Sequence, residues 1–392
     1  MFSSRVPEIW QPNLTTQTFE RLLAEGISVI DLTESNPTRV GLEYPSDLLQ
    51  DFGGEDSLVY DPQPRGLSDA RLSVAAHLGL QGLTIDADRV VLTTGTSEAY
   101  SILFKLLCDP GDIVLIPEPS YPLLEYLARL DGIEPVSYPL VYDGAWEIDG
   151  DALWDRVSDR TRALVIVNPN NPTGSFLSGA GYKLVCEVCR KFGLALISDE
   201  VFGQYSLDTI AGPVRSVMGT TSDVLTFGLG GFSKSIGLPQ LKLSWIIVDG
   251  DHRNVALALR KLEFIADSYL SVSTPVQRAA RGLLERGSLV ADQIKERVRI
   301  NYSKLSSLVG TFPALDLLRS DGGWYAVLQV PDVLSEEALV LELLEKEHLR
   351  VHPGYLFDFP GEAFLVLSLL LEPKVFENGL IRLLSRAANT AT

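Results

Sequence analysis

The sequence predicts an α/β protein whose large domain has three layers, with helices on both faces of a mostly parallel, seven-stranded sheet. Short runs rich in β-branched residues alternate with longer stretches that carry apolar residues at helical spacing, which is typical of βαβ units. Several short runs are apolar at every position, as expected for strands buried on both faces. The 392 residues are enough for this domain and a smaller one.

The alternation begins near residue 90 and predicts seven strands. They are Val90–Thr93, Ile113–Ile116, Pro135–Tyr138, Ala163–Asn168, Ala195–Ser198, Val224–Phe227 and Leu243–Val248. Between them, Ser97–Leu107 and Gly179–Phe192 place apolar residues on one face of a helix. The chain order of these elements favours a parallel sheet with helical crossovers.

The two ends of the chain have an α+β pattern instead. Near the N-terminus we expect a short helix at Phe19–Ala24 and a strand at Ser28–Leu32. Towards the C-terminus the expected elements are a long charged helix at Leu289–Val309, a strand at 322–328, a helix at Ser335–Glu347 and a strand at Phe364–Ser368. We therefore predict a large domain of residues 46–285 and a small domain built from 1–45 and 286–392.

Charge and composition exclude some classes of partner. Lys and Arg number 33 against 51 Asp and Glu, so the net charge of −18 disfavours binding to nucleic acid and to anionic membranes. No apolar run approaches the roughly 18 residues that span a bilayer, and the N-terminus has no apolar signal-peptide core. Three cysteines are too few for a disulfide scaffold, which favours a reducing, cytoplasmic location. Cys186 and Cys189 lie within a helical pattern, and we expect no metal site.

Four polar segments follow predicted strands, where open parallel sheets bind ligands. Gly95, Thr96 and Ser97 stand at a helix start, where backbone N–H groups can bind a phosphate, although an ordinary capped helix has the same appearance. Asn171 belongs to a turn of two prolines and a glycine, which alone could be only a turn.

The other two segments supply an acid and an amine. Asp199 ends a buried strand, where a carboxylate needs a partner, although it could simply cap a helix. Lys234 lies between apolar strands, where burial can lower the pKa of an amine and make it nucleophilic, although a surface lysine is the ordinary alternative. Together the four segments suit pyridoxal 5′-phosphate, which needs an amine, an anion at its ring nitrogen and a phosphate site.

Three motifs are specific in combination: Asn-Pro-Asn-Asn-Pro-Thr-Gly at 168–174, Ser-Asp-Glu-Val at 198–201 and Ser-Lys-x-x-Gly-Leu-Pro at 233–239. With them, nearly the whole chain resembles the class I/II aminotransferases among the fold-type I pyridoxal-phosphate enzymes. The resemblance implies that Lys234 forms a Schiff base with the cofactor and then carries a proton between substrate and cofactor. Asp199 would pair with the ring nitrogen, Asn171 would bond the ring oxygen and Tyr121 would stack on the ring.

The resemblance also implies a phosphate site and a dimer. The phosphate would be held by Gly95, Thr96, Ser97, Ser233 and Lys242. Tyr60 would reach the phosphate of a neighbouring subunit, which implies a homodimer with shared sites.

The sequence departs from the family pattern at four positions. Lys242 replaces an arginine on the phosphate and so lacks its two-pronged geometry, Gly231 replaces a serine, and Phe202 replaces a tyrosine near the ring oxygen. Val366 stands where an arginine usually binds the substrate α-carboxylate.

Either another cation therefore binds the carboxylate, or the substrate has none. We expect Asn36 and Arg39, in the Asn36-Pro37-Thr38-Arg39 loop, to contact the substrate. The other candidate cations are Arg65, Arg350 and His352.

The leading prediction is an aminotransferase that moves an amino group between an amino acid, or an amine, and a 2-oxo acid. Another reaction of the same cofactor, such as that of a β-lyase, a racemase or an oxidase, is the alternative. A cofactor-binding regulator or an inactive relative is a third reading, disfavoured because Lys234 and Asp199 are both present and no basic DNA-binding module is visible.

Overall fold

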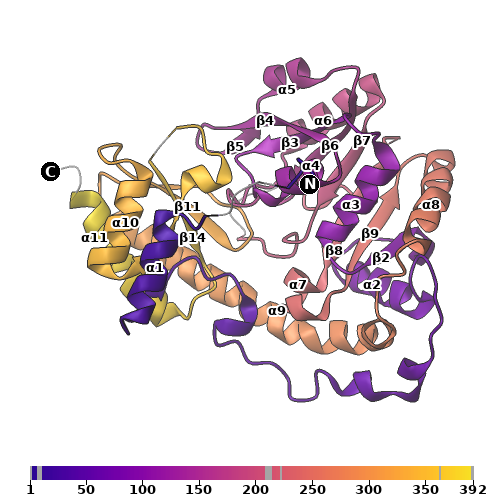
Figure 1. Ribbon diagram of the computed structural model, residues 1–392, viewed down its shortest axis with the longest axis horizontal. Helices are drawn as coiled ribbons and strands as arrows, with labels where there is room; N and C mark the ends of the chain where they lie inside the picture. The colour runs from indigo at the N-terminus through magenta and orange to yellow at the C-terminus, as the bar shows by residue number, and fades with distance from the viewer. Residues whose placement is uncertain (1, 7–10, 208–213, 221–222, 362, 390–392) are drawn as a thin grey trace.

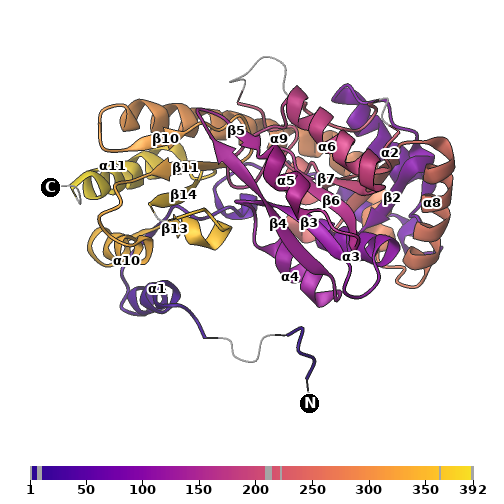
Figure 2. The same ribbon diagram turned by 90° about the horizontal axis from the view of Figure 1, so that it is seen from above.

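The computed structural model describes residues 2–6, 11–207, 214–220, 223–361 and 363–389. It has a large lobe around one sheet and a small lobe that holds the C-terminal elements and helix α1 (Figures 1 and 2). The helices are α1 (Leu14–Ala24), α2 (Ser68–Leu80), α3 (Thr96–Leu107), α4 (Leu123–Leu130), α5 (Gly150–Arg156), α6 (Gly179–Phe192), α7 (Phe232–Ser235), α8 (His252–Asp267), α9 (Thr274–Val309), α10 (Glu336–Glu347) and α11 (Pro373–Asn389).

The large sheet contains all seven predicted strands. Within the described residues its strand order is β2-β9-β8-β7-β6-β3-β4-β5. The strands are β2 (Val90–Thr93), β3 (Ile113–Glu118), β4 (Glu134–Tyr142), β5 (Trp146–Ile148), β6 (Thr161–Val167), β7 (Ala195–Asp199), β8 (Thr226–Gly231) and β9 (Ser244–Asp249). Strands β4, β3, β6, β7 and β8 are parallel, whereas β9 runs antiparallel between β2 and β8. The short β5, antiparallel to β4, was not expected.

Helices cover both faces of this sheet, which confirms the three-layer prediction. On one face, side chains of α3 and α8 such as Leu103 and Leu262 pack on Phe227 of β8. On the other face, Val74 of α2 and Leu283 of α9 belong to a second apolar cluster with the sheet. Strands that contribute to both clusters must be apolar throughout, which explains their continuous apolar runs.

The small lobe is an antiparallel sheet of order β10-β11-β14-β13 with α10, α11 and α1 around it (Figure 2). Its strands are β10 (Asp316–Leu318), β11 (Tyr325–Gln329), β13 (His352–Pro353) and β14 (Phe364–Ser368), and a further pair joins β1 (Ile30–Asp31) to β12 (Leu349–Arg350). Strand β14 has the predicted bounds. The expected strand at 322–328 begins only at Tyr325, and the expected strand at Ser28–Leu32 contracts to β1.

Helix α9 begins at Thr274, so the prediction of a helix starting at Leu289 was wrong by four turns. Its N-terminal half buries small and apolar residues, including Ala279, Ala280 and Leu283, and these do not form a clear apolar stripe. The helix packs against α2 in the large lobe and α11 in the small lobe (Figure 1). The division of the domains at residues 285 and 286, which we still propose, therefore falls inside one continuous helix.

A second connection joins the lobes at Gly174. The backbone N–H of Asp321 donates to the Gly174 carbonyl at 3.0 Å, and Gly323 donates to the Tyr205 carbonyl at 2.8 Å. Gly174 has a φ of 68°, and a Cβ built there would lie 1.9 Å from Ser320 Oγ. Only glycine satisfies both conditions, so the turn after β6 is held directly against the segment before β11.

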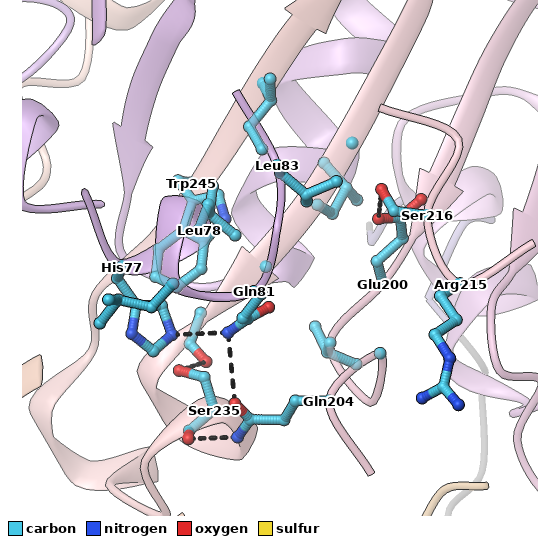
Figure 3. A pocket seen from close by; sticks show the side chains of 18 of the residues that line it. His77, Leu78, Gln81, Leu83, Glu200, Gln204, Arg215, Ser216, Ser235 and Trp245 are labelled. Atoms are coloured by element: carbon cyan, nitrogen blue, oxygen red, sulfur yellow. Dashed lines mark hydrogen bonds between the residues drawn. The ribbon is translucent and has the colours of Figure 1, made fainter. Parts of the chain in front are cut away.

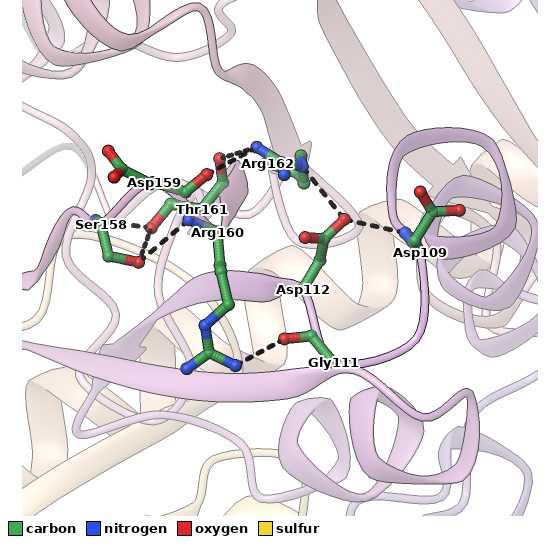
Figure 4. Close-up of polar contacts among 8 residues, drawn as sticks. All are labelled: Asp109, Gly111, Asp112, Ser158, Asp159, Arg160, Thr161 and Arg162. Atoms are coloured by element: carbon green, nitrogen blue, oxygen red, sulfur yellow. Dashed lines mark hydrogen bonds and ion pairs between the residues drawn. The ribbon is translucent and has the colours of Figure 1, made fainter.

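The N-terminal ends of β3 and β6 are held together by polar contacts (Figure 4). Arg162 Nε donates to Asp112 Oδ2 at 3.0 Å, and the Arg160 guanidinium donates to the Gly111 carbonyl at 2.9 Å. The Asp109 N–H also donates to Asp112, at 2.9 Å. These contacts lie at the opposite ends of the strands from Asp199. Within the described residues, no helix is both long and apolar enough to cross a membrane.

Candidate active site

Lys234 projects from the short helix α7, directly after β8. Its Nζ lies 4.7 Å from the centre of the Trp324 ring and 5.3 Å from that of the Phe202 ring. Burial lowers the pKa of Lys234 to about 8, and the negative charge of Asp199 opposes that shift. A larger fraction of this amine is therefore unprotonated near neutral pH than for a lysine in water, and an unprotonated amine is a nucleophile.

Asp199 ends the neighbouring strand β7 and is buried. Its carboxylate accepts hydrogen bonds from the Tyr100 hydroxyl at 3.0 Å and from the Val201 N–H at 3.2 Å. Burial raises the pKa of Asp199 to about 6, although these two donors and the charge of Lys234 lower it. A cation held against this carboxylate would keep it ionised.

Sequence reasoning missed Tyr100. It lies one turn after Thr96 on α3, and its ring is buried while its hydroxyl reaches Asp199. The sequence did contain a signal for this contact. The helix starts at the edge of the sheet where ligands bind, and its buried face carries a tyrosine, whose hydroxyl requires a hydrogen-bond partner.

Gly95 and Lys242 lie together at the start of α3. No side chain caps this helix, so its first backbone N–H groups are available to an anion. A Cβ built on Gly95 would be 3.5 Å from Lys242 Nζ, an ordinary contact distance, so the lysine ammonium lies directly beside the helix start. Of the neighbouring predicted residues, Ser97 is exposed, while Thr96 and Ser233 are partly buried.

Gly231, which stands in place of the expected serine, has a local structural reason. A Cβ there would lie 2.1 Å from the Oγ of Ser244, its partner in β9. A side chain at residue 231 therefore cannot fit, because Ser244 already occupies that space.

Asn171 is buried in the turn after β6, and its Oδ1 has no hydrogen-bond partner among the described residues. The neighbouring Asn168 holds the turn in place, donating to the Val214 carbonyl and accepting from the Leu177 N–H. A buried amide oxygen without a partner is costly unless a ligand or water bonds it.

Tyr121 is 46% exposed. It lies close enough to Tyr325 to contribute to the pKa shift of the Tyr325 hydroxyl. Burial raises the pKa of Tyr325 to about 12, with smaller contributions from Tyr121 and Glu34, while a hydrogen bond from Ser35 opposes them. The Tyr325 ring also lies 6.4 Å from the Phe202 ring. Segment 34–35 near the N-terminus therefore meets the aromatic side chains around Lys234.

A cavity of about 650 Å³ lies behind α7, and a polar chain crosses it (Figure 3). His77 bonds Gln81 at 3.0 Å, Gln81 donates to Gln204 at 3.3 Å, and Gln204 donates to the Ser235 carbonyl. The hydroxyl of the adjacent Tyr205 donates to the Lys234 carbonyl. Burial lowers the pKa of His77 to about 4, so the histidine in this chain of hydrogen bonds is uncharged near neutral pH.

Three predicted residues have no described contact with Lys234. Tyr60 is 73% exposed and Arg39 is exposed, and no contact between described residues joins either of them to Lys234. The Asn36 side chain accepts from Thr38 and caps the short turn Pro37–Arg39. Their predicted roles remain predictions.

Comparisons with known proteins agree with this geometry. Residues 53–378 match the family model described as aminotransferase class I and II. An alanine aminotransferase of Mycobacterium tuberculosis is 29% identical, with 89% of this chain and 83% of the relative covered. Nicotianamine aminotransferase A of Hordeum vulgare is 30% identical, with 82% of this chain and 71% of the relative covered.

The fold agrees as well. The crystal structure of an aminotransferase from Escherichia coli is similar with a TM-score of 0.84 and 22% identity, covering 98% of this chain and 97% of that one. The family match extends over most of the chain and includes the segments that carry Lys234, Asp199 and Asn171. The chain therefore belongs to the class I and II aminotransferases, a family of pyridoxal-phosphate-dependent enzymes.

Proposed function

We propose that this aminotransferase holds pyridoxal 5′-phosphate on Lys234 and moves an amino group between an amino acid or amine and a 2-oxo acid. The observation that carries the proposal is the Lys234 amine, which lies against the Trp324 and Phe202 rings and close enough to the buried Asp199 carboxylate to interact with its charge. When bound, the cofactor supplies an aldehyde that combines with amines and a ring that accepts electrons from the substrate.

The residues present fit this group. The free start of α3 with Lys242 Nζ beside Gly95 suits a phosphate. Asp199 suits a protonated ring nitrogen, and the buried Asn171 could donate its amide N–H to the ring oxygen. Thr96, Ser97 and Ser233 would add donors to the phosphate, and Tyr121 would cover one face of the ring.

The protein's own groups would then perform three tasks. Lys234 Nζ would hold the cofactor through its aldehyde and, once a substrate is bound, would serve as the base that moves the proton of the substrate carbon. Asp199, oriented by Tyr100 and Val201, keeps a proton on the ring nitrogen. Trp324 and Phe202 exclude water from the amine, which keeps its pKa low.

We also propose a homodimer in the cytoplasm, in which Tyr60 reaches the partner's phosphate site. The exposure of Tyr60 and of the apolar side chains next to it supports an interface there. The names of the bacterial relatives make alanine and glutamate the first amino acids to test as donors.

A single-turnover experiment tests this function. Holoenzyme mixed with one amino donor should lose the visible absorbance band of the bound cofactor and form pyridoxamine phosphate and a carbonyl product in equal amounts. Lys234→Ala should abolish both, whereas Lys261→Ala, which removes an exposed lysine from α8, should change neither. Release of ammonia with the cofactor left unchanged would show a lyase instead.

A further inference from the structure

One wall of the site is formed by β11 and β14. Tyr325 pairs with Ser368 and Val327 pairs with Val366, so these four residues share one face of the antiparallel pair. The Tyr325 ring lies 6.4 Å from that of Phe202, which in turn lies 5.3 Å from Lys234 Nζ. This face, called here the β11–β14 wall, is therefore two contacts away from the reacting amine.

The wall is apolar at the position where a carboxylate-binding cation was expected. Val366 is completely buried and belongs to an apolar cluster with Val327 and Phe357. Its other strand partner is His352, whose pKa is lowered to about 4 by burial and, to a smaller extent, by Arg350, while Asp31 opposes the shift. This histidine is therefore uncharged near neutral pH and supplies no cation.

Two of the other candidate cations are already paired. Arg350 bonds Asp31 at 3.1 Å and lies over the Phe19 ring. Arg65 lies 3.5 Å from Glu263 and donates to the Asp88 carbonyl. Arg39 remains, and it is exposed.

A carboxylate instead lies beside the wall. Ser368 Oγ donates to the Glu34 carbonyl at 2.6 Å, and Glu34 and Ser35 both affect the pKa of Tyr325, so segment 34–35 lies against the wall. The Glu34 carboxylate accepts the Asn36 N–H at 2.8 Å. No Lys, Arg or His of the described residues forms an ion pair with it.

We propose that this wall selects amines: the preferred amino donor lacks a carboxylate on its amine-bearing carbon, and Glu34 favours a donor with a second positive charge. The proposal rests on the proposed function. An α-carboxylate here would meet an apolar surface and a like charge, and both raise its free energy. A cationic group would find in Glu34 a partner that the fold leaves without a counter-ion.

The reaction balances as an ordinary amino transfer. A primary-amine donor passes its amino group and one hydrogen of the amine-bearing carbon to the cofactor. The oxygen of the cofactor aldehyde passes, by way of water, to the donor carbon, so the donor leaves as an aldehyde and the cofactor becomes an amine. A 2-oxo acid then regenerates the cofactor and becomes an amino acid. Because this acceptor carries a carboxylate to the same wall, we expect its KM to be high.

Three donors with one carbon skeleton test the proposal in the first half-reaction alone. L-Norleucine, pentylamine and cadaverine differ only by a carboxylate and by a second amino group. The second-order rate constant for loss of the cofactor band should be at least about tenfold greater for pentylamine than for norleucine. The same rate constant should be about fivefold greater for cadaverine than for pentylamine.

Two variants assign the charge preference. Glu34→Gln, which keeps an oxygen for the Asn36 N–H, should lower the ratio of cadaverine to pentylamine to about two, the statistical value for two equal amino groups. Glu20→Gln removes an exposed carboxylate of α1 and should leave the ratio unchanged. Thermal unfolding of both variants should match the parent protein, and a Glu34→Gln ratio equal to the parent's overturns the role of Glu34.

The opposite outcomes are equally distinct. If norleucine reacts as fast as pentylamine or faster, the wall does not select amines, and loss of that advantage in Arg39→Ala would identify Arg39 as the carboxylate clamp. If neither the three donors nor alanine or glutamate converts the cofactor, the proposed aminotransferase function is wrong, and so is the proposed preference for amines. A donor preference for amino acids with normal conversion would instead leave the function standing.

Discussion

Lys234 and Asp199 each lie in surroundings that favour the uncharged form. Burial is the largest cause of both shifts, and the mutual attraction of the two groups opposes it only in part. The motifs predicted these two residues and Asn171, because each follows a buried strand. The contact of Tyr100 with Asp199 and those of Trp324 and Phe202 with the amine could not be predicted as firmly, since they depend on how helices and a second lobe pack.

The lowered pKa of Lys234 predicts its reactivity in cofactor-free protein. Its folded pKa of about 8 lies below the ordinary 10.5, so its amine should become reactive towards an acylating reagent at a pH some two units lower than an exposed lysine. Between these values the unfolded chain binds more protons, so this group makes the free energy of unfolding rise with pH. Mass spectrometry measures the labelling of Lys234 and Lys261 as a function of pH and gives the pH at which labelling of each residue is half-maximal. Equal half-maximal pH values for the two residues would contradict the prediction.

Lys242 should hold the cofactor phosphate through its charge. Lys242→Ala removes the ammonium beside Gly95 and should raise the dissociation constant of the cofactor by about tenfold or more. Lys242→Arg should retain tight binding, because its guanidinium can bond two phosphate oxygens. Titration of cofactor-free protein with the cofactor measures both constants, and unchanged affinity in Lys242→Ala would remove the lysine from the phosphate site.

Helix α7 is only four residues long, so tertiary contacts must hold it in place. Gln204 and Tyr205 bond two successive carbonyls, those of Ser235 and Lys234. Tyr205→Phe leaves the Lys234 carbonyl without this donor and should lower the free energy of unfolding by about 1–3 kcal/mol. Denaturant unfolding measures the loss, with the exposed Tyr126→Phe as a control that should change little.

Asp112 should make the start of β3 and β6 sensitive to acid. The Asp109 N–H, followed by Arg162, holds the pKa of Asp112 below its ordinary 3.8. Its folded pKa lies below its unfolded one, so its contribution is present above pH 3.8 and is lost as the pH falls through the folded value. The parent should therefore exceed Asp112→Asn in free energy of unfolding at neutral pH, with a difference that shrinks in acid. A constant difference would contradict this.

The bounds of helices and strands were predicted most accurately where the sequence marks their ends. Helix α6 has the predicted bounds because Ser178 caps its start and Gly193 ends it with a positive φ of 67°. The first half of α9 was missed because small buried residues give no clear apolar stripe. Strand β5 has three residues with one buried, too few for a recognisable alternation.

The arrangement of the lobes was predicted only in outline. The contacts of Glu34 with Ser368 and of Ser35 with Tyr325 join residues more than 280 positions apart. Such pairs have no local pattern, because each partner alone has the properties of an ordinary loop or strand residue. The sequence predicted a small domain made from both chain ends but not which residues of it face Lys234.

An exposed apolar patch on the large lobe should be buried between two copies. Leu58 is 88% exposed, Tyr60 73% and Phe264 78%, and the Tyr60 loop is joined to α8 by the Arg65–Glu263 ion pair. Leu58→Asp combined with Phe264→Glu should convert a dimer to a monomer and weaken cofactor binding. Analytical ultracentrifugation checks the mass. A parent protein that is monomeric at micromolar concentration would contradict the homodimer.

The close contact at Gly174 limits how this enzyme can acquire new substrates. Because Ser320 Oγ occupies the space of any side chain there, the asparagine turn and the segment before β11, which carries Trp324, cannot be remodelled separately. Segment 34–39, held to the wall by a few side-chain bonds, has no such constraint. Libraries that vary this loop should therefore yield folded enzymes of altered specificity far more often than libraries that vary residues 172–176 or 320–323.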